Sequence, residues 1–67
     1  MMANDYIRKC LKTTGIKMWQ LADELGMSEF TLSRKMRYEF SEPDRIKYVQ
    51  AINKLVEDRE NGNWRFD

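Results

Sequence analysis

The chain has 67 residues, one cysteine and no histidine, so it has room for a single domain and lacks the ligands of a Cys/His zinc site. Its net charge of +1 is unevenly divided, with seven basic and four acidic side chains in residues 1–38 and five basic and seven acidic in residues 39–67. This asymmetry favours binding of a polyanion by the first half of the chain. The N-terminal residues contain no long apolar run, so we expect no signal peptide or membrane span and a cytoplasmic location.

The first predicted helix begins after Asn4, a residue type favoured as an N-cap, and ends before Gly15. Apolar residues recur on one face of this segment at helical spacing. Its lone cysteine is expected to act as a small core hydrophobe rather than as a reactive thiol. The residues expected on or beside the inner face are Ile7, Cys10, Leu11 and Thr14.

A second helix is predicted from about Met18 to Leu25, preceded by an apolar plug at Ile16. Lys17 stands where Ser or Thr would cap better, so the start of this helix is expected to be poorly capped. A core-facing stripe is expected along one side of the helix. Its members are Leu21, Ala22 and Leu25.

A tight corner follows, because Gly26 suits the left-handed conformation in which many helices end. Ser28 can then cap a third helix, predicted over residues 29–37, by accepting a hydrogen bond from an N–H of its first turn. Leu32 and Met36, four residues apart, are expected to face inward. Two short helices joined in this way form the geometry of a helix-turn-helix, whose second helix enters the major groove of DNA.

After Phe40, expected as a core or hinge aromatic, Ser41 and Pro43 mark the start of a fourth helix over residues 42–59. Asn61 and Gly62 mark its end. We therefore predict an all-α four-helix bundle over residues 1–60 with a tail over residues 61–67. The apolar stripe of the last helix is expected at Ile46, Val49, Ile52 or Asn53, and Val56, flanked by Tyr48 and Leu55.

The span from Ile16 to about Leu55 resembles the lambda-repressor/Cro-like helix-turn-helix family in its small phage or mobile-element form. The resemblance rests on Leu21-Ala22-x-x-x-Gly26-Met27-Ser28 and on the block from Leu32 to Arg37. It implies a repressor-like regulator of transcription that binds operator DNA, usually as a homodimer. Lys17-Met18 departs from the family, which often begins the second helix with a phosphate-contacting glutamine after a Ser or Thr cap.

In this motif the exposed N-terminal half of the second helix faces base edges. Arg34 is expected to donate two hydrogen bonds to a guanine, while Glu29 either accepts from a cytosine amino group or only favours the helix dipole. Phe30 is expected either on a thymine methyl group or buried against the last helix or the tail. The full set of expected base contacts is Ser28, Glu29, Phe30, Ser33 and Arg34.

Phosphate contacts demand less geometry, since any cation or N–H donor in reach can serve. Trp19 is expected either to donate its indole N–H to a phosphate or to pack against the first or third helix. Tyr38 is open to the same two interpretations, phosphate contact or core. The expected phosphate contacts are Lys17, Trp19, Lys35, Arg37 and Tyr38.

Two large aromatic side chains stand in the polar tail, where exposure would be unfavourable in a monomer. They are expected either to fold back on the body or to join a dimer interface with the edge of the last helix. The residues assigned to this dimer or tail contact are Tyr48, Leu55, Trp64 and Phe66.

Three functions remain open: a sequence-specific regulator on double-stranded DNA, a protein-interaction module that keeps the helix-turn-helix shape, and an excisionase-like architectural factor. The near-neutral charge and the carboxylates of Asp23, Glu24 and Glu29 favour the interaction module. An enzyme is not expected, because histidine, a Gly-rich phosphate loop and paired carboxylates are all missing. No cofactor, metal or small-molecule ligand is expected.

Overall fold

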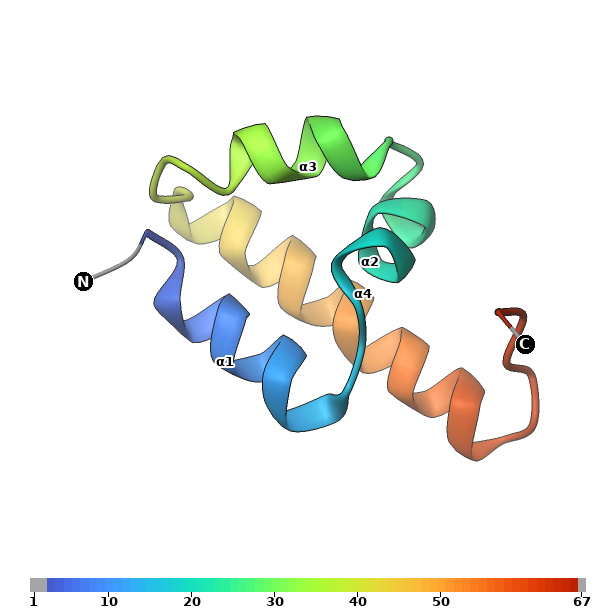
Figure 1. Cartoon of the computed structure of the whole chain (residues 1–67). Helices are drawn as coiled ribbons and strands as arrows, with labels where there is room; N and C mark the ends of the chain where they lie inside the picture. Colours follow the sequence, from blue (N-terminus) through green and yellow to red (C-terminus); the bar gives the residue numbers. More distant parts are fainter. Residues whose placement is uncertain (1–2, 67) are drawn as a thin grey trace.

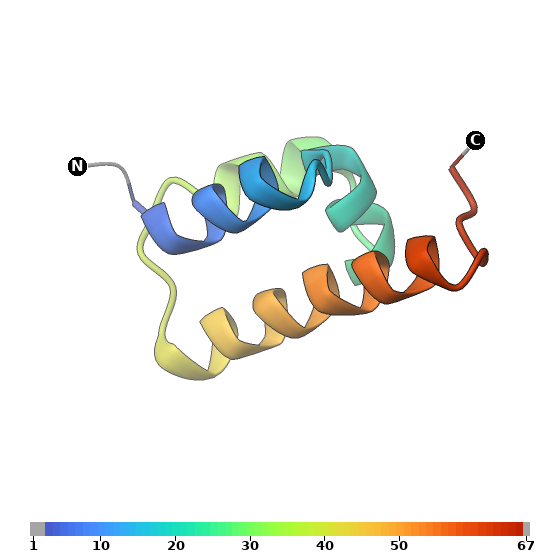
Figure 2. The same ribbon diagram turned by 90° about the horizontal axis from the view of Figure 1, so that it is seen from below.

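A computed structural model describes residues 3–66, which form four helices and no strand. The helices are α1 (Asp5–Thr14), α2 (Met18–Leu25), α3 (Glu29–Lys35) and α4 (Glu42–Glu60). α1 and α4 lie side by side and run in the same general direction, while α2 packs on both α3 and α4 (Figures 1 and 2). The all-α prediction is confirmed. None of the described helices is long and apolar enough to span a bilayer.

The corner between α2 and α3 follows its predicted chemistry. Gly26 ends α2 in the left-handed region at φ 74°, where an added Cβ would be strained even though space is open around it. Ser28 lies in extended backbone and its hydroxyl oxygen accepts a hydrogen bond from the Thr31 N–H at 3.1 Å. These two local preferences set the direction of α3 relative to α2.

The start of α2 is better satisfied than the sequence suggested. Gln20 turns its side chain back, and its Oε1 accepts from the Lys17 backbone N–H at 2.8 Å. The side chain of Gln20 is buried in doing so. Lys17 itself makes no side-chain capping hydrogen bond, as expected, so the Gln20 bond satisfies the N–H of the cap residue and not those of the first turn.

α1 begins directly after Asn4, as predicted, but Asn4 does not cap the helix with its side chain. The residue adopts left-handed backbone at φ 60° and its side chain makes no capping hydrogen bond. Instead Nδ2 donates to the carbonyl oxygens of Met36 (3.0 Å) and Tyr38 (2.9 Å), and Oδ1 accepts from the Phe40 N–H (2.8 Å). Asn4 is only 2% exposed, so it serves as a buried pin that holds the connection between α3 and α4.

Arg8 strengthens the same connection. Its Nε donates to the Ala3 carbonyl at 2.9 Å and its Nη2 donates to the Met36 carbonyl at 3.2 Å. Although it counts towards the basic first half of the chain, much of the donor capacity of Arg8 is thus committed within the protein.

The core draws on all four helices and on Ile16, the predicted plug. Cys10 is half-buried and packs against this core, as expected. The fully or nearly fully enclosed apolar residues are Ile7, Leu11, Ile16, Leu21, Ala22, Leu32, Met36, Tyr48, Ala51, Ile52 and Leu55.

The inner face of α4 differs from the predicted stripe. Tyr48, Ile52 and Leu55 are buried, whereas Ile46 is 48% exposed and Val49 is half-buried. The physical reason is that α1 and α2 both pack on α4 and enclose one side of it. Tyr48 and Leu55, assigned from sequence to a dimer or tail contact, therefore belong to the core, and that assignment is wrong for both.

Tyr48 stacks at a tilt on Phe40, with ring centroids 4.3 Å apart. Burial, and to a lesser degree the charge of Asp44, raises the pKa of the Tyr48 phenol. The unfolded chain therefore releases this proton first, so the stability that the neutral phenol contributes is complete below pH ~10 and is lost as the pH rises further.

Tyr48→Phe removes this titration and keeps the ring. We expect the variant to lose less of its free energy of unfolding than the wild type between neutral pH and pH above ~10, as measured by urea unfolding. Tyr38→Phe, at an exposed ring, is the matched control and should follow the wild-type curve. Parallel alkaline losses for wild type and Tyr48→Phe would contradict the prediction.

Candidate nucleic-acid interface

One side of α3 packs on the core and the opposite side is exposed. Leu32 and Met36 point inward and are 0% and 1% exposed, as predicted. Phe30 is 71% exposed, so the alternative that it is buried against α4 or the tail is wrong. α3 also lies along an outer edge of the bundle (Figure 1). The structure leaves all five expected base contacts exposed: Ser28, Glu29, Phe30, Ser33 and Arg34.

Phe30 and Arg34 contact one another on this surface. The guanidinium carbon of Arg34 lies 5.8 Å from the centroid of the Phe30 ring, as their spacing of four residues on a helix allows. Beside them an open hollow of about 370 Å³ is lined by Arg34, Lys35 and Tyr38, together with Thr31. The outer side of α3 thus combines aromatic and cationic groups.

α3 ends at Lys35, two residues earlier than predicted. Arg37 and Tyr38 instead lie in a turn, where their N–H groups donate three residues back, to Arg34 (3.2 Å) and Lys35 (3.4 Å). The buried Asn4 pin explains the early end, because its amide group takes up the carbonyls of Met36 and Tyr38. Tyr38 is 77% exposed, so a core role for its ring is wrong.

Lys17 is exposed at the start of α2. It borders an open hollow of about 430 Å³ between α1 and α2, whose lining includes Arg8 and Lys12 as well. No carboxylate lines this hollow. The charged side chains that line this hollow are therefore all positive, and the remaining lining is Leu11, Gly15, Ile16 and Met18.

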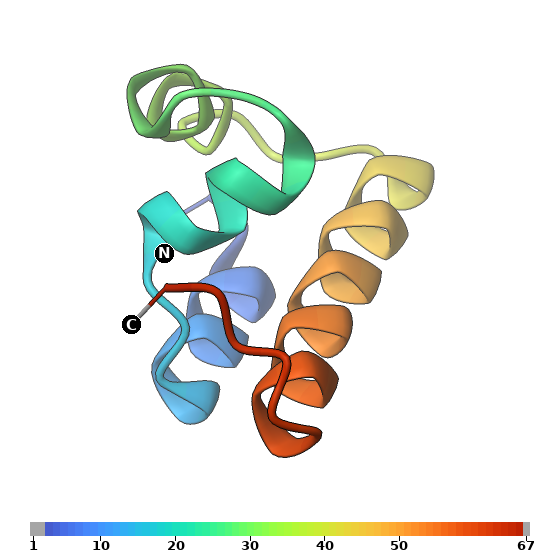
Figure 3. The same cartoon turned by 90° about the vertical axis from the view of Figure 1, so that its right-hand side faces the viewer.

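The C-terminal tail folds back on α2. It crosses from the end of α4 towards the start of α2 (Figure 3), where the rings of Phe66 and Trp19 pack edge to face at a centroid distance of 5.1 Å. Trp64 packs on Phe66 at 4.9 Å and lies under the guanidinium of Arg59. Of the two expectations for the tail aromatics, folding back on the body is the one the structure shows. Trp19 remains half exposed and contacts Phe66, a partner that neither interpretation included.

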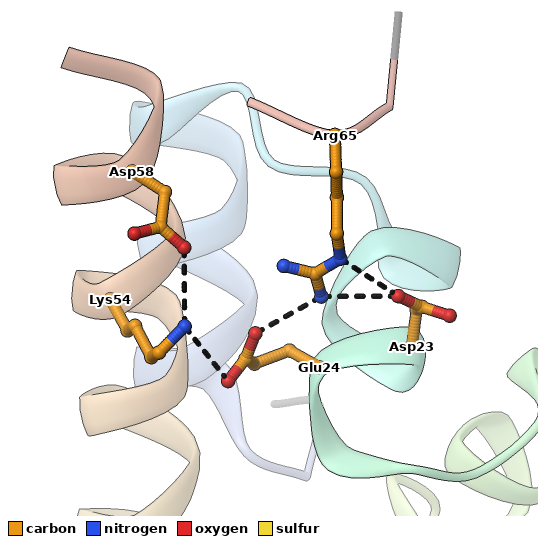
Figure 4. Close-up of polar contacts among 5 residues, drawn as sticks. All are labelled: Asp23, Glu24, Lys54, Asp58 and Arg65. Atoms are coloured by element: carbon orange, nitrogen blue, oxygen red, sulfur yellow. Dashed lines mark hydrogen bonds and ion pairs between the residues drawn. The ribbon is translucent and has the colours of Figure 1, made fainter. Parts of the chain in front are cut away.

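Charged side chains hold the tail in place (Figure 4). Nη2 of Arg65 lies 3.0 Å from both Asp23 Oδ2 and Glu24 Oε1, while Lys54 bridges Glu24 (3.6 Å) and Asp58 (3.2 Å). The hydrogen bond to Asp58 and the nearby charge of Glu24 raise the pKa of Lys54. Two of the three carboxylates that favoured an interaction module are thus already paired within the protein.

The cations of the α3 surface have a different status. Within residues 3–66, Arg34, Lys35 and Arg37 form no ion pair with a carboxylate, and Glu29 is the one acidic residue of α3. Lys17 is likewise without an ionic partner in the described range. The pairing pattern leaves a net positive surface on α3 and at the start of α2, although the whole chain is nearly neutral.

No group of three or more His, Cys, Asp or Glu side chains in the described residues is arranged to hold a metal ion. No protein-family model matches the chain, and neither the curated proteins nor the solved structures searched contain a match.

Proposed function

We propose that the protein is a sequence-specific regulator that binds double-stranded DNA, with α3 in the major groove. The observation that carries the proposal is the outer face of α3, where Phe30 and Arg34 are exposed and Arg34 forms no ion pair within residues 3–66. A helix admitted to the major groove presents such side chains to base edges, which carry the sequence information. The local resemblance to repressors of phages and mobile elements supports the same function.

Contacts with the DNA phosphates would be made by cations and a tyrosine around α3. Lys17 at the start of α2, and Lys35, Arg37 and Tyr38 at the end of α3, are exposed at two ends of the helix-turn-helix. Such groups fix the register of a protein on the duplex without reading its sequence. Trp19 contributes its indole N–H only if the contact with Phe66 leaves that edge accessible to a phosphate.

The proposal includes a homodimer on a palindromic site, since two copies double the number of phosphate contacts that a nearly neutral chain can offer. Tyr48 and Leu55 are buried and cannot form its interface. The exposed apolar side chains of Tyr6 and Ile46 instead border a hollow of about 340 Å³ on α1 and α4. Half-sites one helical turn apart in the selected DNA would show that two copies bind together.

The combined variant Arg34→Ala/Arg37→Ala is expected to weaken binding to a selected duplex by at least about tenfold at low salt, as two cationic contacts are lost. The site is obtained by selection from a random duplex pool, and affinity is measured by fluorescence titration over a series of salt concentrations. The slope of log affinity against log salt should also become shallower, because fewer counterions are released.

Arg45→Ala/Lys47→Ala, which removes two cations at the start of α4, is the matched control and should bind within about twofold of the wild type. Absence of enrichment and of binding at low salt, with the wild-type protein folded by circular dichroism, would rule out the proposed function. Equal losses in the two double variants would show that only net charge, and not the α3 surface, matters.

A further inference from the structure

We infer that Phe30 and Arg34 act as one reading unit for a guanine with a thymine at the adjacent base pair. This inference rests on the proposed function and specifies the DNA that the same surface would recognise. From the sequence, Phe30 and Arg34 were expected to contact the DNA separately. The contact between their two side chains indicates that the two DNA contacts are coupled.

Phe30 does not take part in the core. The ring is 71% exposed, while Leu32 and Met36 provide the apolar contacts that α3 makes with the bundle. Folding therefore does not require an aromatic side chain at position 30, and burying this ring against an apolar group on binding would be favourable. In a major groove the same ring has an apolar partner, the C5-methyl group of thymine.

Arg34 lies beside Phe30 with its donors available. Its guanidinium group contacts the Phe30 ring and forms no ion pair in residues 3–66, so its donors remain free. A guanidinium can donate two hydrogen bonds to O6 and N7 of guanine. Contact with the ring restricts the long side chain before binding, which lowers the entropy lost when those bonds form.

The separation of the two groups sets the spacing of the bases. The guanidinium carbon lies 5.8 Å from the ring centroid. Successive bases on one strand rise by about 3.4 Å, so this separation is less than two steps. If Arg34 bonds to a guanine, the Phe30 ring lies over the neighbouring base pair and not over a more distant one. The unit therefore selects a thymine next to the guanine.

The test uses duplexes enriched by selection from a random pool and then synthesised with single-atom or single-group changes. Replacing the thymine beside the guanine by deoxyuridine removes only the methyl group and is expected to weaken wild-type binding about fourfold. Replacing the guanine by 7-deazaguanine removes N7 and is expected to weaken it about tenfold. Affinities are measured by fluorescence titration at one fixed salt concentration.

The variants establish which side chain senses which group. Phe30→Ala should bind thymine and deoxyuridine duplexes equally, and Arg34→Ala should lose the sensitivity to 7-deazaguanine. In Phe30→Ala the penalty for 7-deazaguanine should also shrink, because the guanidinium is no longer held by the ring. Asn53→Ala changes an exposed side chain on α4, outside the α3 surface, and should retain every wild-type sensitivity.

The outcomes separate the inference from the proposed function. Selective duplex binding without a methyl effect, or a methyl effect that survives Phe30→Ala, would overturn the inference and leave sequence-specific binding intact. Enriched sites that lack adjacent thymine and guanine would do the same. Failure of the folded protein to bind any duplex would remove both.

Discussion

Leu55→Ala is expected to lower the free energy of unfolding by about 3 kcal/mol, within the usual range for truncating a buried leucine. Leu55 is 0% exposed and belongs to the face of α4 that packs against α1 and α2. Its removal costs the transfer free energy of the lost methyl groups and leaves a cavity that a packed core closes only in part. Urea unfolding followed by far-UV circular dichroism measures the change.

A loss of this size is most of the stability that a core in a domain of fewer than about 70 residues provides. Ile46→Ala is the matched control on the same helix, because Ile46 is 48% exposed. It should cost less than about 1 kcal/mol. If the loss at Leu55 were small, or if it depended on protein concentration, Leu55 would lie at a dimer contact as the sequence suggested, and its placement in the core would be wrong.

The elements near the corner could be predicted because their causes are local. Gly26 adopts left-handed backbone and Ser28 accepts from the first turn of α3, and both preferences can be read from the three residues Gly26-Met27-Ser28. The inward pair Leu32 and Met36 follows from helical spacing alone. With two residues fixed inward, the exposure of Arg34 and its neighbours on the opposite side follows as well.

The face of α4 could not be predicted in the same way. Two apolar stripes run along this helix, one through Ile46 and Val49 and the other through Tyr48 and Leu55, and both have helical spacing. Spacing within one helix does not reveal which side its neighbours cover. The packing of α1 and α2 decides it, and that packing is a property of the whole chain.

The contacts of the tail depend on still more distant residues. Arg65 reaches Asp23 and Glu24 across 42 and 41 positions of sequence. Two aromatic side chains in a polar tail indicated that the tail packs against another apolar surface. They did not indicate that Phe66 would contact Trp19. Long-range pairing of this kind has no periodic signal, so the sequence left it open between a fold-back and a dimer.

Asn4→Ala is expected to lower the free energy of unfolding by about 3 kcal/mol. Three hydrogen bonds of its side chain, to Met36, Tyr38 and Phe40, are lost. The Met36 carbonyl keeps the bond from Arg8 Nη2, whereas the part-buried Tyr38 carbonyl and Phe40 N–H lose the bond to Asn4. An unsatisfied buried polar group costs about 1–3 kcal/mol. Alanine would also hold left-handed backbone at an added cost of about 1 kcal/mol, which asparagine tolerates better. Urea unfolding measures the sum.

Asn4→Gly separates the two contributions, because glycine adopts left-handed backbone freely but has no amide to donate. If the pin acts through its hydrogen bonds, Asn4→Gly should remain destabilised by about 2 kcal/mol. Recovery of wild-type stability in Asn4→Gly would instead assign the whole effect to backbone strain. Asn53→Ala, at an exposed asparagine within α4, is the control and should change stability by less than about 0.5 kcal/mol. The Asn4 side chain holds the turn that contains Arg37 and Tyr38. Per folded molecule, Asn4→Gly should therefore also bind DNA more weakly than Asn53→Ala does.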